Sequence, residues 1–328
     1  MMRMTSAFIA TLLGLGLHAA PAQAQLSRTA VSALRGNDAN ACDFAAPRRT
    51  FQRAHDQTND QGEITVLDPG GYGSLVIAKS ISLVNDGVGE ASILVSGGAT
   101  GITINGGPGA YVNLRGITIQ GIGFGGGTGL VFNSGFALTI TNCVVRNHTG
   151  NGIVFQPMGT GVRRLAVSST LVADNGQNGI WVHPIGGDPN DMSAHFSHVL
   201  ALNNSLDGIL VDGAAGSDGS TVGNIISTVA DSVAAANGRG GFAATNIGLV
   251  TVNMMVSRSV AASNGTGVRS IGTLGVGPAV RVGQSSLTGN ASTWVISGSA
   301  FLMSYGDNNV DVNGDGSPGA PNGIIGKK

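Results

Sequence analysis

The chain has 328 residues, of which 54 are glycine and only 11 % are charged, and its net charge is −1. This charge argues against nucleic acid as the main partner, because binding a polyanion requires a basic surface. Two cysteines, Cys42 and Cys143, are too few for a disulfide framework.

The N-terminus is predicted to be a signal peptide covering residues 1–24. It begins Met1-Met2-Arg3, continues through an apolar stretch over residues 7–16, and ends in a small-x-small site at Ala22-Gln23-Ala24. The apolar stretch is too short for a lasting membrane anchor, and no later stretch is longer. We therefore expect a secreted or periplasmic protein with no transmembrane segment after cleavage.

A short capping helix is predicted over residues 50–57, after a leader at residues 25–46. Phe51 and Ala54 would lie on one helical face, with Thr50 as the N-cap. The segment directly precedes the first strand-like sequence. A stack of strands needs such a lid, because its terminal edge and apolar core are otherwise exposed.

An internal repeat explains the glycine content. Six glycines are each followed by a strand-like sequence, at separations of 23, 27, 29, 33 and 26 residues: Gly129, Gly152, Gly179, Gly208, Gly241 and Gly267. Four positions before four of these glycines stand His148, Asn175, Asn204 and Asn237, and Asn264 stands three before the next. Repeats of this kind indicate coils that stack on one another.

The repeat predicts coils of two or three short strands, stacked about 4.8 Å apart around a shared apolar core. Stacking places the same position of every coil in a column. An asparagine column suits such a turn, because asparagine tolerates left-handed backbone and its amide can bond the asparagine above.

These units resemble those of secreted bacterial right-handed parallel β-helix proteins, the superfamily that includes pectate lyases. The resemblance covers residues 62–309 and implies an all-β solenoid over residues 47–310, including the cap. Residues 311–328 are Gly-, Pro- and Asn-rich and are expected to form a flexible tail. The fold does not specify an activity, since it hosts lyases, hydrolases, epimerases, tailspikes and adhesins.

A candidate site follows from strand alternation in the sequence Asn178–Asp191. His183 and Asp212 should point outward one rung apart, with Trp181 beside them. A carboxylate beside an imidazole suits general acid or base catalysis. His183 and Asp212 are therefore the predicted catalytic pair, and the predicted substrate-binding residues are Trp181, Asp188, Asp191, Asp218 and Arg269.

Two functions are open at this point. One is a polysaccharide-binding protein or a surface scaffold, since an indole face stacks on sugar rings. The other is a polysaccharide lyase, glycoside hydrolase or epimerase that uses the His/Asp pair. The motifs Asp-Asp, Gly-His-Gly, Arg-x-Lys and Asp-Pro-His-Asp of enzymes in this superfamily are absent from the sequence. A cross-rung His–Asp pair can also be purely structural.

Other polar positions are assigned simpler roles. No cofactor is expected; the alternative is weak calcium binding by Asp311, Asn313 and Asp315, which match the opening of an EF-hand loop without its helices or final glutamate. His198, Asp231 and Arg258 would form a charge ladder on another face.

An outward apolar strip of Val131, Val154 and Leu210 would permit lateral self-association.

Overall fold

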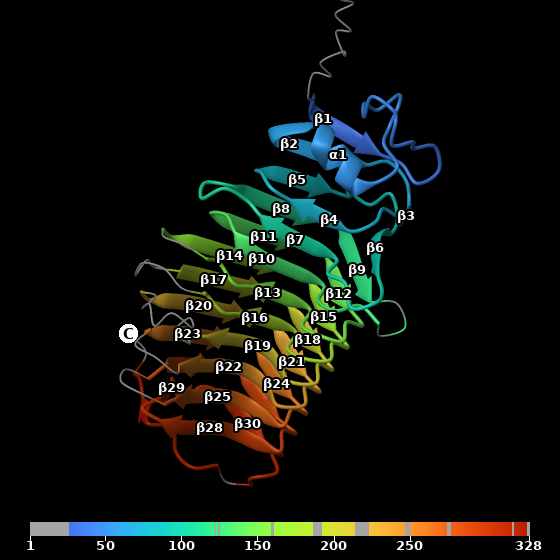
Figure 1. The fold of residues 1–328 in the computed structure, drawn as a ribbon. Coiled ribbons are helices and arrows are strands. Elements are labelled where there is room, and N and C mark those ends of the chain that lie inside the picture. Colours follow the sequence, from blue (N-terminus) through green and yellow to red (C-terminus); the bar gives the residue numbers. More distant parts are fainter. Residues whose placement is uncertain are drawn as a thin grey trace, which may run out of the picture.

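The structure is a computed structural model that describes residues 26–121, 123, 125–158, 161–185, 192–213, 223–246, 250–273, 277–316 and 318–326. The strands of this part of the chain form three parallel sheets, which we call sheets A, B and C. Successive coils stack along one axis, and their order in the stack follows the sequence (Figure 1). The prediction of an all-β right-handed parallel β-helix is confirmed.

Each coil runs through sheet A, then sheet B, then sheet C. Sheet A contains, in spatial order, β1 (Leu26–Val31), β2 (Thr58–Val66), β5 (Ile81–Val84), β8 (Tyr111–Arg115), β11 (Ala137–Thr141), β14 (Arg163–Ser168), β17 (Met192–Ser197), β20 (Ile225–Ala230), β23 (Val252–Ser257), β26 (Ala279–Gly283), β29 (Phe301–Ser304) and β31 (Gly323–Ile324). Sheet B contains β3 (Gly70–Gly71), β6 (Ala91–Val95), β9 (Ile117–Gly121), β12 (Val144–Arg146), β15 (Leu171–Ala173), β18 (Leu200–Leu202), β21 (Val233–Ala235), β24 (Val260–Ala262), β27 (Ser286–Thr288) and β30 (Asn309–Asp311). Sheet C contains β4 (Leu75–Ile77), β7 (Ile102–Asn105), β10 (Leu130–Ser134), β13 (Ile153–Phe155), β16 (Ile180–Val182), β19 (Asp207–Asp212), β22 (Gly240–Asn246), β25 (Thr266–Gly272) and β28 (Ser292–Gly298).

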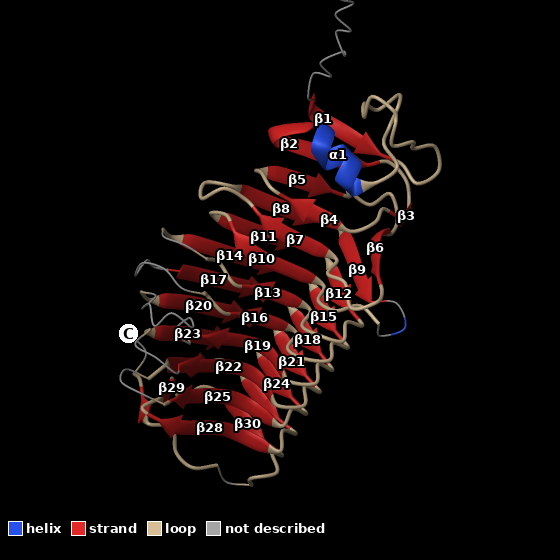
Figure 2. Ribbon diagram, viewed as in Figure 1, coloured by secondary structure: helices blue, strands red, loops and turns tan. Residues whose placement is uncertain are grey.

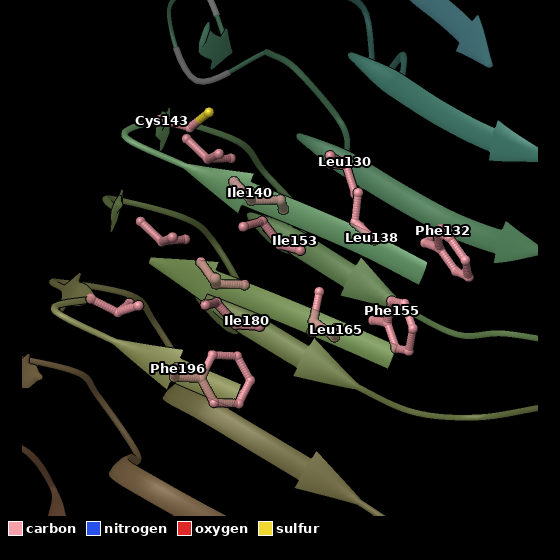
Figure 3. Close-up of a cluster of buried hydrophobic side chains, with 14 of the residues drawn as sticks. Leu130, Phe132, Leu138, Ile140, Cys143, Ile153, Phe155, Leu165, Ile180 and Phe196 are labelled. Carbon is pink, nitrogen blue, oxygen red and sulfur yellow. The ribbon is translucent and has the colours of Figure 1, made fainter. Parts of the chain in front are cut away.

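The core is a continuous column of apolar side chains between the sheets. Alternate residues of each strand point inward, as the two-residue period of a strand requires. Like residues of neighbouring coils stack: the rings of Phe132 and Phe155 are parallel within 24° at a centroid distance of 4.5 Å (Figure 3). One coil could not bury this surface alone, so each depends on its neighbours.

The predicted asparagine column is confirmed as a buried ladder. In each step the Nδ2 of one asparagine donates to the Oδ1 of the next, at 2.9 to 3.0 Å, from Asn175 to Asn313. The same Oδ1 also accepts the backbone N–H of the preceding asparagine, as between Asn204 and Asn237. Because these turns are buried, the ladder supplies partners that water cannot.

His148 occupies the first described position of this column, as the sequence predicted. Its backbone N–H donates to the Oδ1 of Asn175 at 3.3 Å, and its Nε2 lies 3.3 Å from the carbonyl oxygen of Ile119. The amide of Asn204 makes the corresponding bond to the carbonyl of Val172. The imidazole therefore substitutes for the asparagine amide.

The turns between the sheets differ in length. From β11 to β27, each A strand is separated from the following B strand by two residues. The first of these residues has a left-handed backbone, with φ between 47° and 53°: Asn142, Ser169, His198, Asp231, Arg258 and Gln284. By contrast, the five connections from sheet C to sheet A between β13 and β26 vary from 5 to 12 residues. The differences in coil length in this region therefore fall mainly on the connections from sheet C to sheet A.

The N-terminal end is closed by α1 (Phe51–Gln57), the blue helix beside β1 and β2 in Figure 2. Thr50 is its N-cap and accepts the N–H of Arg53, and Phe51 and Ala54 are buried, as predicted. Phe51 also stacks on Tyr72 at 4.8 Å.

The strand pairing extends past the predicted boundaries at both ends. The expected leader at 25–46 contains β1, which pairs in parallel with β2 and belongs to sheet A. The expected tail at 311–328 contains β31, which pairs with β29. In β1 the alternation of apolar and polar residues is short, and β31 has only two residues. Neither strand therefore shows the sequence repeat by which the other coils were recognised.

The C-terminal segment is tied to the last coil by hydrogen bonds. Both carboxylate oxygens of Asp315 accept from Thr293, and the indole Nε1 of Trp294 donates to the carbonyl of Gly319 at 2.8 Å. Asn322 exchanges hydrogen bonds with Leu302. These contacts close the second end of the stack.

Among the described residues, none lies in a helix with the length and apolar character needed to cross a bilayer.

Candidate functional site on the outer face of sheet C

The predicted His–Asp pair is formed by two neighbouring rungs of sheet C. The register pairs Ile180 with Ile209, Trp181 with Leu210, and Val182 with Val211, so the next residues, His183 and Asp212, are also neighbours. The Nδ1 of His183 lies 3.4 Å from an Oδ2 of Asp212, and their side chains are 19 % and 13 % exposed. The contact is an ion pair when the imidazole is protonated, but its alignment is not that of a hydrogen bond.

Trp181 lies on the same outward face and stacks on His183. The two ring centroids are 4.4 Å apart, and the ring planes differ by 16°. Strand alternation causes this contact, because residues two apart point to the same side of the sheet. The imidazole of His183 therefore packs against the indole, and Asp212 lies beside its Nδ1.

Thr245 is a third member of the column that sequence reasoning did not assign to the site. Thr245 pairs with Asp212 in the sheet, and its hydroxyl donates to the Oδ1 of Asp212 at 2.7 Å. On the other side, Gln156 bonds Asn133, which bonds Asn105, each at 2.9 Å. The sequence column placed Thr245 one rung from Asp212, but only coordinates show that its hydroxyl turns to the carboxylate.

Two nitrogen atoms of the site are buried without a hydrogen-bond partner among the described residues. They are the Nε1 of Trp181 and the Nδ1 of His183. An unsatisfied buried donor destabilises a protein by about 1–3 kcal/mol. The site thus presents a stacked indole–imidazole pair with a carboxylate beside it.

Arg269 lies in the column of Trp181, and its side chain is directed to a buried carboxylate. Its register places it after Trp181, Leu210 and Ala243, as the sequence indicated. Its guanidinium bonds both oxygens of Asp207 at 3.0 and 3.1 Å, and Asp207 is completely buried. The guanidinium therefore neutralises a buried carboxylate, and a role of Arg269 in substrate binding remains a prediction.

Asp207 is held by a second arginine as well. The Nε of Arg239 donates to an Oδ2 of Asp207 at 2.8 Å, and its Nη2 makes a second bond to the same oxygen. Gly240 gives Arg269 its path, because a Cβ there would lie 2.6 Å from the carboxylate of Asp207 and 2.7 Å from the Cδ of Arg269. Sequence spacing could not show this pairing across two rungs.

Three of the predicted contact residues, Asp188, Asp191 and Asp218, lie outside the described residues. They remain predictions.

The residues proposed for weak calcium binding use their oxygens within the protein. The Oδ1 of Asn313 accepts the ladder bonds of Asn290, and both oxygens of Asp315 accept from Thr293. Asp311 accepts the N–H of Val312. In the part of the chain that the structure describes, no three His, Cys, Asp or Glu side chains form a metal-binding group.

The apolar strip proposed for lateral association is largely covered. Val154 and Leu210 point outward from the sheet but are only 4 % and 5 % exposed, whereas Val131 is half-buried. Lateral association through this strip remains a prediction.

The charge ladder on the opposite turns is formed in part. Arg258 makes two hydrogen bonds to Asp231, both at 2.8 Å, in an exposed position. The residues of this column are the left-handed turn residues between sheets A and B, rather than strand residues facing outward. Cys143 is buried as predicted, and burial raises the pKa of its thiol to about 11, which disfavours the thiolate.

Comparisons with known proteins identify the fold. No protein-family model matches the chain, and no curated protein matches it. Among solved structures, pectate lyase Pel9A is 16 % identical, with a TM-score of 0.53 over 90 % of this chain and 79 % of the lyase. The A-module of mannuronan C-5 epimerase AlgE4 from Azotobacter vinelandii is 12 % identical, with a TM-score of 0.38 over 81 % of this chain and 91 % of the module. A rhamnogalacturonan lyase is 14 % identical, with a TM-score of 0.33 over 89 % of this chain and 86 % of the lyase. The chain thus has the fold of the pectin-lyase-like β-helix proteins.

Proposed function

We propose that the protein binds a neutral polysaccharide on the outer face of sheet C, around Trp181, His183 and Asp212. The observation that carries the proposal is the stacked Trp181–His183 pair with a carboxylate 3.4 Å from the imidazole. Sugars have apolar ring faces and hydroxyl edges. An aromatic surface bordered by a carboxylate matches both.

The charges favour a neutral ligand at this site. Asp212 contributes a carboxylate that accepts hydrogen bonds from sugar hydroxyls but repels an acidic sugar. Arg269, the nearest cation in the adjoining column, is already bound to Asp207.

Affinity electrophoresis and calorimetry with neutral glucans, mannans and xylans would test this function. Trp181→Ala should weaken binding at least tenfold, because it removes the stacking surface. The chain has one other tryptophan, Trp294, whose indole bonds Gly319 at the end of the stack. Trp294→Phe is therefore the matched control and should bind as the native protein does. Equal affinities for the native protein and Trp181→Ala would refute the assignment.

Catalysis is the second candidate function, and the His183–Asp212 contact favours it. A positioned imidazole and carboxylate could serve as general acid and base in a polysaccharide lyase, glycoside hydrolase or epimerase. Reducing ends, unsaturated products and epimerised sugars would be measured with purified protein. Turnover that His183→Ala and Asp212→Asn both reduce at least a hundredfold would establish this function over simple binding.

Export is also part of the proposal. Cleavage after Ala24 would leave β1 complete, because that strand begins at Leu26. N-terminal sequencing of exported protein should therefore begin at Gln25. A mature N-terminus within β1 would contradict the proposal, since it would break the pairing with β2.

A further inference from the structure

We propose that two copies of the chain pair through the outer face of sheet B. The surface consists of the outward side chains of five successive strands, β12, β15, β18, β21 and β24, which lie side by side in Figure 1. We call it the sheet B face. The inference goes beyond the saccharide function on sheet C and does not depend on it.

The sheet B face is apolar in both of its columns. Each strand has three residues, of which the middle one is buried in the core and the other two point outward. The outward residues are Val144, Leu171, Leu200, Val233 and Val260 in one column and Arg146, Ala173, Leu202, Ala235 and Ala262 in the other. Leu200 is 42 % exposed, and the others except Ala173 are half-buried.

This pattern is typical of a strand that is covered on both sides. Strands with one face in water alternate apolar and polar residues, whereas strands buried on both faces are continuously apolar. Sheet A alternates in the same coils, with Thr139, His195 and Thr228 outward. The sheet B strands do not alternate, although their outer side chains are accessible. An exposed apolar patch of this kind marks a contact surface.

A surface cavity of about 410 Å³ lies along one border of the face. Its lining joins Val144, Leu171 and Leu200 of the apolar column to His198 and Asp231 of the turns between sheets A and B. Apolar and charged side chains therefore border the same hollow, and a partner that covers the face must match both.

The order of the turn residues favours a second copy whose stack runs in the opposite direction. Successive coils have Asn142, Ser169, His198, Asp231, Arg258 and Gln284 at this border. Two copies can lie face to face with a twofold axis parallel to the strands, between β18 and β21. Each His198 then faces Asp231 of the other copy, and each Ser169 faces Arg258. Moving the axis onto β18 or β21 would place His198 or Asp231 opposite itself, which disfavours those registers.

The same register matches the apolar side chains by size. Leu200 lies opposite Val233 of the second copy, and Leu171 lies opposite Val260. In the other column Leu202 lies opposite Ala235. Each leucine thus meets a smaller side chain, as a self-complementary twofold interface requires.

The size of the face predicts a weak dimer. Five strands span about 19 Å along the stack, and a three-residue strand is about 10 Å long. The face is smaller than the roughly 800 Å² that each partner contributes to a stable complex of standard size. We therefore expect dimers at micromolar or higher concentrations of protein and monomers below them.

Sedimentation velocity of the purified protein over a wide range of concentrations tests the dimer. Leu200→Asp should raise its dissociation constant at least tenfold, because the new carboxylate would lie against Val233 of the other copy. Ile226→Asp is the matched control: Ile226 is 49 % exposed on sheet A and should tolerate the same change without effect on the dimer. Circular dichroism of each variant checks that the fold is retained.

A charge exchange tests the register. His198→Asp places carboxylates opposite each other, and Asp231→Arg places cations opposite each other, so each variant alone should dimerise at least tenfold more weakly. An equimolar mixture of the two variants should form a heterodimer, since every contact is then between opposite charges. A mixture that associates no better than its components would refute this register.

Other results would overturn the pairing itself. A native protein that stays monomeric at hundreds of micromolar would exclude it. A dimer that persists in Leu200→Asp but dissociates in Val131→Asp would place the contact on the apolar strip of sheet C. Phospholipid vesicles that bind the native monomer but not Leu200→Asp would assign the sheet B face to a membrane instead.

Discussion

The buried asparagines each satisfy several polar groups at once. Asn237, for example, donates from Nδ2 to the carbonyl of Ala201 and to the Oδ1 of Asn264, while its Oδ1 accepts from the backbone and side chain of Asn204. Its neighbours are almost completely buried, so water cannot replace the lost bonds. The residue therefore stabilises two coils besides its own.

Asn237→Ala should lower the free energy of unfolding by about 2–4 kcal/mol, because it leaves buried donors and acceptors of both neighbouring rungs unpaired. Urea denaturation measures this change. Asn113→Ala is the control: Asn113 is exposed and bonds only the hydroxyl of Ser82, so its loss should change stability by less than about 1 kcal/mol. A loss in Asn237→Ala no larger than in the control would show that the ladder does not contribute to stability.

His148 makes the ladder sensitive to pH. Burial lowers the pKa of this imidazole below its ordinary value of 6.5. Below that value the unfolded chain binds a proton that the folded chain does not, so acid favours unfolding. The stability contributed by neutral His148 is therefore present above about pH 6.5 and falls as the pH drops.

His148→Asn should flatten this dependence, because an asparagine keeps the amide donor and has no proton to gain. Urea denaturation at several pH values between neutrality and moderate acid would measure the slope. Some slope should remain, since burial and then Lys79 also lower the pKa of His55 in α1. A slope as steep as that of the native protein would show that His148 does not titrate with folding.

At the scale of strands, β19, β22 and β25 are joined by the buried carboxylate of Asp207. Arg239, directly before β22, and Arg269, in β25, reach this carboxylate, and the missing side chain of Gly240 leaves the space. Removing one member of a buried ion pair typically destabilises by about 3–5 kcal/mol, since a charge remains without its partner.

Arg269→Met should therefore lower stability and leave affinity for saccharides unchanged. The stability loss should be about 1–3 kcal/mol, below the usual range for a buried pair, because Arg239 still neutralises Asp207. Thermal unfolding and the binding assays measure the two properties separately. A weaker affinity in a variant of native stability would restore the predicted role of Arg269 in substrate binding.

The strands of the repeat could be predicted from sequence, whereas their polar contacts could not. The strand that contains Trp181 pairs with its two neighbours in the register that the glycine spacing predicted. Apolar alternation decides which side chains of each strand point inward, and stacking then decides which residues of neighbouring strands lie side by side. The direction of a long side chain depends on its neighbours in three dimensions. For this reason the sequence placed Arg269 on the right column but missed its bonds to Asp207.

At the scale of the whole molecule, the stack is closed at both ends by segments without a repeat signal. The helix α1 covers one end, and the segment that contains Asp315 and Gly319 is bonded to the last coil. Strand pairing continues into the segments that composition assigned to a leader and a tail, because a terminal sequence can be ordered when its backbone finds partners.

Asp315→Ala should loosen the C-terminal end. It removes two hydrogen bonds to Thr293, a loss of about 1–3 kcal/mol, and should shift the emission of Trp294 to longer wavelength as its surroundings become wetter. The measurement uses a Trp181→Phe background, in which Trp294 is the only tryptophan. Asp311→Ala is the control, since that carboxylate bonds only the adjacent Val312. Identical spectra for both variants would show that Asp315 does not hold this end.

The seam between sheets C and A gives the molecule a particular capacity for diversification. His183 is the first residue of a connection of 9 residues, and Asp212 directly precedes a connection of 12 residues. In the same coils, every turn from sheet A to sheet B has two residues. Insertions accepted at this seam leave the coil circumference and its core intact. Changes of loop length at this seam can therefore alter the surroundings of His183 and Asp212 without rebuilding the scaffold that carries them.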